Sequence, residues 1–115
     1  MTINTKKFFS LNHQVVFYIP STNQTEAEFK DQTKKIAEYF TNAFGGSSVE
    51  RVGGHYKMND GSHAVEVINK VISFTDDKTL ERQAEAIFKL ASLKARQLKQ
   101  ETIAIEIDQK LILID

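Results

Sequence analysis

Residues 48–74, SVERVGGHYKMNDGSHAVEVINKVISF, carry the strongest structural signal in the chain, because they read as two β-rich segments joined by a short polar turn. The turn contains Asn59-Asp60-Gly61, and Asp-Gly between two such segments is a strong hairpin signal since both positions tolerate positive φ. Residues 48–58 and 62–74 are therefore expected to form adjacent antiparallel strands.

The register of this hairpin depends on the length of its turn. With Asp60-Gly61 as a two-residue turn, His55 lies opposite Glu66, whereas a three-residue turn shifts every pairing by one. In the two-residue register one face is apolar and is expected to face the core; it carries Val52, Tyr56, Met58, Val65 and Val67. The other face is polar and carries Arg51, His55, Lys57 and Glu66. Beyond residue 67 the apolar positions change parity, which indicates a bulge near Asn69 or a strand buried on both faces.

Two amphipathic helices flank the hairpin. The first begins with a capping box formed by Thr25 and Glu28, carries apolar residues every three or four positions, and ends at Gly45-Gly46. The second begins at residues 75–77, where acidic side chains can cap the first turn. Its buried stripe is expected to be Leu80, Ala84, Ile87, Ala91, Ala95 and Leu98.

Three further strands complete the order β-α-β-β-α-β-β. Residues 14–19 form the first strand, and residues 102–107 and 110–114 form a strand and its short C-terminal partner. The first six elements match the split βαβ arrangement. We therefore expect an α+β, ferredoxin-like antiparallel sheet with both helices on one face and an extra C-terminal strand.

This layout resembles that of ferredoxin-like dimeric α/β-barrel proteins. The Phe44-Gly45-Gly46 helix stop and the Gly53-Gly54-His55-Tyr56 segment are also similar to those of a group of small bacterial domains. The first resemblance implies that two sheets pair around a small-molecule cavity. It supports the fold more than any one activity, because one fold carries many functions.

Composition limits the function classes. A chain of 115 residues is expected to form one domain, residues 1–115, with residues 1–12 as an N-terminal arm. Fifteen basic and fifteen acidic residues balance, which argues against a nucleic-acid binder that relies on net positive charge, and the absence of cysteine excludes thiol chemistry. No apolar run is long enough for a membrane span or a signal peptide, so the cytoplasm is the expected location.

Candidate chemistry gathers in residues 51–63 of the hairpin and in Glu66 across from them. His55 opposite Glu66 would form an acid–base pair, with Tyr56 as a proton donor and with Arg51, Lys57 and His63 as binding residues. His55 and His63 are expected on opposite faces, so no metal site is predicted. No sequence motif indicates a cofactor either.

Phe8 and Phe9 precede the first strand and have no obvious place in the core, so they indicate an arm that either folds back over the sheet or docks on a partner. The open sheet face is expected to hold His55, Lys57, Glu66, Thr102 and Glu106 beside apolar residues, a surface that a second subunit would close. The leading interpretation is a non-catalytic, dimeric module that binds a protein or a small molecule. The first alternative is a small cofactor-free enzyme of the dimeric α/β-barrel type that uses His55 and Glu66 as acid and base. The second is a nucleic-acid-associated accessory protein.

Overall fold

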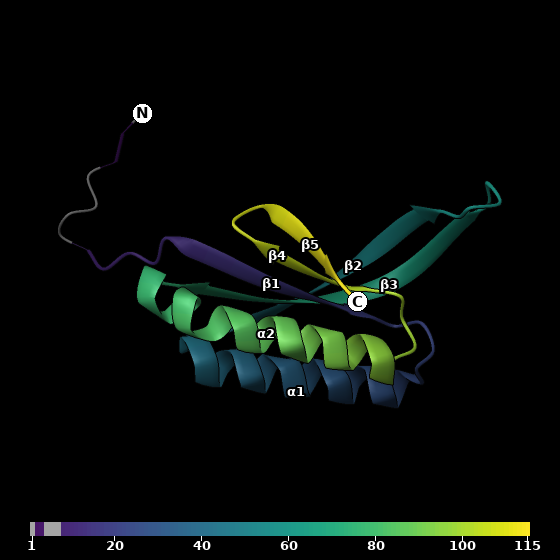
Figure 1. The fold of residues 1–115 in the computed structure, drawn as a ribbon, viewed down its shortest axis with the longest axis horizontal. Coiled ribbons are helices and arrows are strands. Elements are labelled where there is room, and N and C mark those ends of the chain that lie inside the picture. The colour runs from purple at the N-terminus through teal and green to yellow at the C-terminus, as the bar shows by residue number, and fades with distance from the viewer. Residues whose placement is uncertain (1, 4–7) are drawn as a thin grey trace.

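The structure is a computed structural model that describes residues 2–3 and 8–115, so part of the predicted N-terminal arm, Met1 and residues 4–7, lies outside the described residues. Its elements follow the expected order (Figure 1). They are β1 (His13–Pro20), α1 (Glu26–Phe44), β2 (Ser48–Lys57), β3 (His63–Thr75), α2 (Asp77–Gln97), β4 (Ile103–Ile107) and β5 (Lys110–Ile114). Every predicted element is present, with ends that differ by a residue or so.

The five strands form one antiparallel sheet in the order β2-β3-β1-β4-β5. Both helices lie against the same face of this sheet, and the hairpin of β2 and β3 extends beyond them (Figure 1). The predicted α+β, ferredoxin-like fold with an added C-terminal strand is therefore confirmed. No helix in the described part of the chain is long and apolar enough to span a bilayer.

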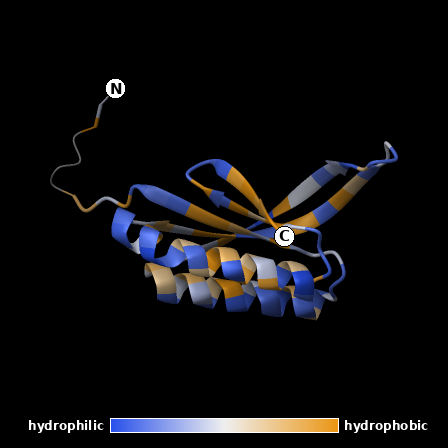
Figure 2. Cartoon of the chain, in the orientation of Figure 1, coloured by the Kyte–Doolittle hydropathy of each residue, from blue (hydrophilic) through white to orange (hydrophobic). Residues whose placement is uncertain are grey.

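The core lies between the sheet and the two helices. Alternate residues of β1 point toward the helices, and Phe17 meets Phe40 of α1 edge-on, with ring centroids 6.1 Å apart. Phe40 also packs against Phe44 at 5.4 Å. Both helices carry hydrophobic and hydrophilic bands (Figure 2), as expected for elements buried on one side only. The fully buried core side chains are Val15, Phe17, Ile19, Phe29, Ile36, Phe40, Val71, Ile87, Ala91, Ala95, Ile103 and Ile105.

The helix ends confirm the predicted signals. The Thr25 hydroxyl accepts a bond from the Glu28 amide at 3.1 Å, and the Glu28 carboxylate accepts one from the Thr25 amide at 2.9 Å, which completes the capping box. Gly45 has φ +93°, a left-handed conformation in which its amide bonds back to Thr41. Asp76 caps α2 through the amide of Thr79.

The hairpin turn differs from the two-residue prediction. The Met58 amide bonds to the Ser62 carbonyl at 2.8 Å, which leaves three residues in the loop. The Asp60 carboxylate accepts bonds from the amide and the hydroxyl of Ser62, and Gly61 takes φ +86°, so the tripeptide is stable as a unit.

This turn shifts every hairpin pairing by one residue. His55 lies opposite Val65, and Gly54 lies opposite Glu66. The predicted His55–Glu66 pair was therefore wrong, because neighbouring positions on a strand point to opposite faces. The predicted apolar face was wrong as well: Tyr56 lies on the side away from the helices, and Val65 lies on the same side as His55.

The predicted bulge near Asn69 is absent, because the pairing of β2 with β3 runs without interruption from residue 48 to residue 57. Burial on both faces, the alternative, holds at Ile68 but not farther along the strand, where Ile72 is half-buried and Phe74 is exposed. Ile68, Asn69 and Val71 are all buried, since here β3 lies between two neighbouring strands. Apolar residues on both faces of β3 are therefore accommodated without a break in its pairing with β2.

A hydrogen-bonded cluster of His13, Asp108 and Asp77, called the His13 cluster below, links the start of β1 to the β4–β5 turn and to α2. The Nδ1 atom of His13 lies 2.5 Å from an oxygen of Asp108, in the β4–β5 turn, and its Nε2 atom contacts Asp77 at the start of α2. The other oxygen of Asp108 accepts a bond from the Gln14 amide at 2.8 Å. A histidine that donates from both ring nitrogens is an imidazolium, so this contact depends on pH.

We expect the His13 cluster to contribute less stability as the pH rises. Its hydrogen bonds to Asp108 and then to Asp77 raise the pKa of His13 above 6.5. A raised pKa adds stability that is fully present below the unfolded value and is lost as the pH rises through the folded value. In turn, the bond from His13 lowers the pKa of Asp108. The stability that the charged Asp108 carboxylate contributes is therefore lost as the pH falls and Asp108 is protonated.

The urea midpoint of the wild type should therefore exceed that of His13→Gln most at about pH 5–6, and the gap should narrow by about pH 9. Equilibrium unfolding followed by circular dichroism across this range checks the prediction. A gap of constant size at every pH would contradict it.

Candidate active site on the open sheet face

A cleft of about 370 Å³ lies on the face of the sheet that the helices leave uncovered. Tyr18, Ile68 and Glu66 point into it because they have the opposite strand parity to the core residues Phe17 and Val71. The cleft is closed at one end by the segment that follows α2. Its lining residues are Tyr18, Pro20, Tyr56, Glu66, Ile68, Gln100, Glu101, Thr102, Ile103, Ala104 and Leu113.

Glu66 is held from the loop after β1. The amide of Thr22 donates to Oε2 of Glu66 at 3.1 Å, and the Thr22 hydroxyl contacts the same oxygen. Gln100 in turn donates to the carbonyl of Thr22 at 3.4 Å. Both contacts from Thr22 fall on one carboxylate oxygen, so the other oxygen, Oε1, is the one placed to meet a ligand.

Tyr56 lies close beside Glu66, and a glycine makes this possible. A Cβ atom on Gly54 would lie 2.7 Å from the Tyr56 hydroxyl and 2.7 Å from Cδ1 of Ile68, so the ring occupies the space that a side chain would fill. Burial raises the pKa of Tyr56, and the charge of Glu66 raises it further. The phenol is therefore protonated at neutral pH and available as a donor.

Gly54→Ala is expected to displace the Tyr56 ring, because the added methyl group would lie only 2.7 Å from the Tyr56 hydroxyl. Gly53→Ala is the matched control, since a Cβ there meets nothing within 4 Å. We expect the free energy of unfolding of Gly54→Ala to be lower than that of Gly53→Ala by about 1–2 kcal/mol. The pKa of Tyr56, followed by NMR, should also move back toward 10. Equal stabilities and an unchanged Tyr56 titration would contradict this account.

A second tyrosine completes the aromatic part of the cleft. The Tyr18 hydroxyl donates to Glu106 at 2.6 Å, and the Lys70 ammonium lies 5.3 Å from the centre of the Tyr18 ring. Burial, followed by the bond to Glu106, raises the pKa of Tyr18 to about 12. Tyr18 is thus locked in orientation and presents its ring to the cleft.

The charged groups that line the cleft are both carboxylates, Glu66 and Glu101, and its lining contains neither lysine nor arginine. The rest of the wall is apolar, from residues such as Ile68 and Leu113. A negative, partly apolar cleft attracts cations and strengthens electrostatic contacts inside it. The site is therefore suited to a small cationic ligand with an aromatic part.

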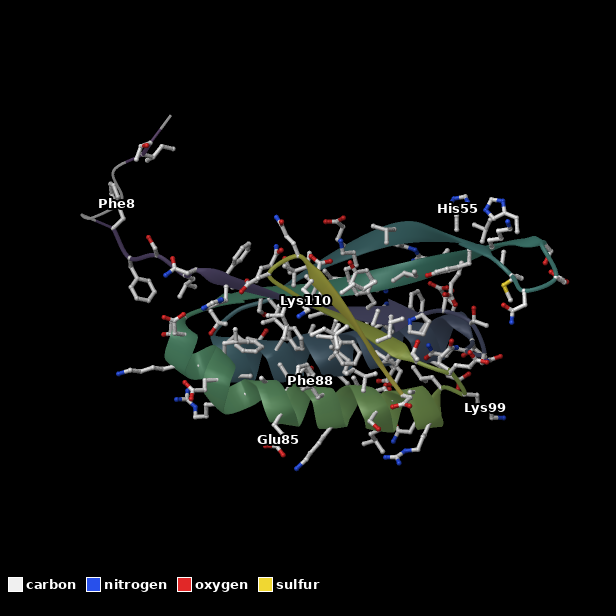
Figure 3. All side chains as sticks on the ribbon, turned by 45° about the horizontal axis from the view of Figure 1, so that its top comes forward. Phe8, His55, Glu85, Phe88, Lys99 and Lys110 are labelled. Atoms are coloured by element: carbon white, nitrogen blue, oxygen red, sulfur yellow. The ribbon has the colours of Figure 1, made fainter. Side chains whose placement is uncertain are left out.

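The predicted site residues divide between two faces. Tyr56 and Glu66 come together in the cleft, whereas His55, Lys57 and His63 lie on the other face of the hairpin. His55 is at the free end of that hairpin (Figure 3).

The remaining predicted binding residues also lie away from the cleft. Arg51 is engaged on the helix side, where it contacts Glu26 at 3.4 Å and lies over the ring of Phe29. Phe8 and Phe9 are 72% and 85% exposed and do not line the cleft.

The prediction from sequence missed the residues that the loop after α2 supplies, Gln100 and Glu101. Their signal is weak, because a polar loop after a helix looks the same whether or not it borders a site. Thr102 was correctly expected near this face, as was Glu106, which holds Tyr18.

Comparisons with known proteins support the fold. No protein-family model matches the chain, and no curated protein matches it. A solved phage SAM lyase in complex with S-methyl-5'-thioadenosine matches with 13% identity and a TM-score of 0.66, over 97% of this chain and 95% of that chain. A phage SAM lyase in the apo state matches with 14% identity and a TM-score of 0.60, over 89% and 87%.

These neighbours overturn the leading functional interpretation. A non-catalytic interaction module was expected, but the solved chains that share this fold over almost their whole length are those of an enzyme. The finding favours the alternative that the sequence left open, a small enzyme. At such low identity, what the likeness itself shows is that this chain has the fold of those lyase chains.

Proposed function

We propose that the protein is a lyase that acts on SAM, S-adenosylmethionine, in the cleft of the open sheet face. The observation that carries the proposal is the lining of that cleft, on the fold of a SAM lyase. Two carboxylates and two tyrosines line it, and Lys70, which lies over the Tyr18 ring, is outside the lining. The substrate has a sulfonium, an ammonium and an adenine ring. Its charge and its aromatic part match the cleft.

The size of the cleft agrees with this substrate. Its volume of about 370 Å³ falls in the usual range of small-molecule sites, about 300–1,000 Å³. Tyr18 and Tyr56 offer ring faces, and Glu66 and Glu101 offer negative charge. The two tyrosines would contact the adenosine part, and the carboxylates would hold the polar groups.

The reaction breaks the bond between the sulfur and the γ-carbon of the aminobutyrate chain. The electron pair stays on sulfur, so the sulfonium becomes the neutral thioether of S-methyl-5'-thioadenosine. The substrate's own carboxylate attacks the γ-carbon and closes a five-membered lactone, so no water is consumed and no proton moves. This step needs no acid–base pair, which agrees with the position of His55 outside the cleft.

The role of Glu66 follows from which group of the substrate loses its positive charge in this step and which group keeps it. An anion beside the sulfur would stabilise the substrate more than the transition state, because the sulfur loses its charge as the bond breaks. The α-ammonium keeps its charge throughout. We therefore assign Glu66 to that group, where it would orient the aminobutyrate chain for attack.

The test is an activity assay with the purified full chain and SAM. S-methyl-5'-thioadenosine and homoserine lactone should form in equal amounts at a rate well above the uncatalysed one, measured by liquid chromatography and NMR. S-adenosylhomocysteine, which lacks the sulfonium charge, should bind more weakly. Absence of both turnover and SAM binding would overturn the proposal, and homoserine as the first product would replace the lyase by a hydrolase.

We further propose that a second copy of the chain covers the open face. Three apolar side chains on this face are largely exposed: Phe74 (53%), Leu111 (57%) and Leu113 (62%). An exposed apolar surface of this kind is typical of a contact with another protein chain. The exposed Phe8 and Phe9 could add to the same contact. Cytoplasmic location stays a prediction.

Light scattering after size exclusion should give a mass at least twice that of one chain. Leu111→Lys should shift the protein toward the monomer, because a buried charge opposes association. Lys110→Ala, on the neighbouring residue, serves as the control. A monomeric wild type at all concentrations would contradict self-association without bearing on the cleft.

A further inference from the structure

The free end of the β2–β3 hairpin carries two histidines that the proposed reaction does not use. Lys57 pairs with His63 and His55 pairs with Val65, so the two imidazoles are diagonal neighbours on one face of the ladder. Nδ1 of His55 and Nε2 of His63 are joined by a hydrogen bond of 3.0 Å, and the ring centroids are 5.1 Å apart. Both residues are exposed (His55 is labelled in Figure 3).

We propose that His55 and His63 form a chelating site for one divalent late transition-metal ion, with Cu²⁺ or Ni²⁺ preferred over Zn²⁺. The site goes beyond the proposed lyase activity and does not depend on it. It was not expected from the sequence, because the predicted register placed the two side chains on opposite faces. The three-residue turn removes that objection.

The separation of the two nitrogens suits a single metal ion. Imidazole nitrogens bind such ions at about 2.0–2.1 Å, so an ion that replaces the shared proton and keeps the 3.0 Å separation would see the two nitrogens about 94° apart. This is close to the 90° between neighbouring ligands in square-planar and octahedral geometry. It is well below the tetrahedral angle that Zn²⁺ prefers, which favours Cu²⁺ and Ni²⁺.

The surroundings make the site open rather than closed. Within residues 2–3 and 8–115, no group of three or more His, Cys, Asp and Glu side chains could hold a metal ion. Glu66 points to the other face, and Asp60 is engaged by Ser62. Two imidazoles therefore supply the protein ligands and water completes the coordination. The nearby Lys57 opposes the cation.

A bound ion would link β2 to β3 near the turn. This part of the hairpin lies beyond the helices (Figure 1), and residues 55–63 are all exposed. Because the ion binds only where both strands are paired, it would stabilise the hairpin end against local opening.

The experiment uses the full chain without a histidine tag, cleared of metal by a chelator and then titrated with CuCl₂, NiCl₂ or ZnCl₂. Calorimetry should show one tight equivalent of Cu²⁺, with Ni²⁺ next and Zn²⁺ weakest. Electron paramagnetic resonance of the Cu²⁺ sample should show two nitrogen ligands. His55→Ala and His63→Ala should each weaken Cu²⁺ binding by at least about tenfold.

Two further variants make the test specific. His13→Gln removes the histidine outside the pair and should leave Cu²⁺ affinity unchanged. Lys57→His in the His55→Ala background places a second imidazole directly across from His63 and should restore binding. Equal Cu²⁺ affinity in the wild type and in both alanine variants would overturn the proposal, and tightest binding of Zn²⁺ would overturn the argument from the angle.

Discussion

Glu66→Gln is expected to lower kcat/KM for SAM by about 10²-fold, because it removes the charge that orients the reacting chain. Glutamine has nearly the same size and keeps a carbonyl oxygen that can accept the bond from the Thr22 amide. The loop after β1 should therefore stay in place, and the loss should come from the missing charge. Steady-state rates of S-methyl-5'-thioadenosine release measure the effect.

The matched control for this change is Glu50→Gln. Glu50 lies on β2 and points to the same open face, but it does not line the cleft. The two variants change the net charge equally, so a long-range effect of charge would appear in both. Activity of Glu66→Gln within threefold of the wild type, or equal losses in both variants, would contradict the role assigned to Glu66.

The largest loss of stability is expected for Phe40→Ala. The Phe40 side chain is fully buried between β1 and the end of α1, where it meets Phe17 and Phe44 edge-on. Truncation removes both aromatic contacts and leaves a cavity, because the sheet and the helix cannot close around it. The free energy of unfolding should fall by about 3–5 kcal/mol, as measured by urea denaturation.

Phe9→Ala makes the same chemical change at a side chain that is 85% exposed. It should alter the free energy of unfolding by no more than about 0.5 kcal/mol. A loss of less than 1 kcal/mol for Phe40→Ala would show that the core can close around the gap. The Phe17–Phe40 contact would then contribute little to stability.

The elements of the fold were predictable because their signals are local. The capping box at Thr25 and Glu28 and the left-handed Gly45 act through residues three or four positions apart, and the structure contains both. Strand alternation in residues 103–107 likewise appears as a strand with buried Ile103 and Ile105. The order of these elements then leaves few ways to form a sheet.

The candidate site was predicted only in part. Tyr56 and Glu66 were both singled out, but the predicted register placed them on opposite faces and paired Glu66 with His55. The observed register, shifted by one residue, puts Tyr56 and Glu66 on the same face. The turn chemistry of Asp60 and Ser62 decided that register, and a one-residue change moves every side chain to the other face. The same change brought His55 and His63 together.

By itself, the sequence determined which elements form and in what order, since capping, periodicity and turn residues act over a few positions. Only the tertiary structure decided which face each hairpin residue occupies and which distant segments meet. The cleft joins β1, the hairpin, the loop after α2, β4 and β5, and Thr22 contacts Glu66 across 44 positions of the chain. No local pattern encodes such a contact, because it depends on the packing of the whole sheet.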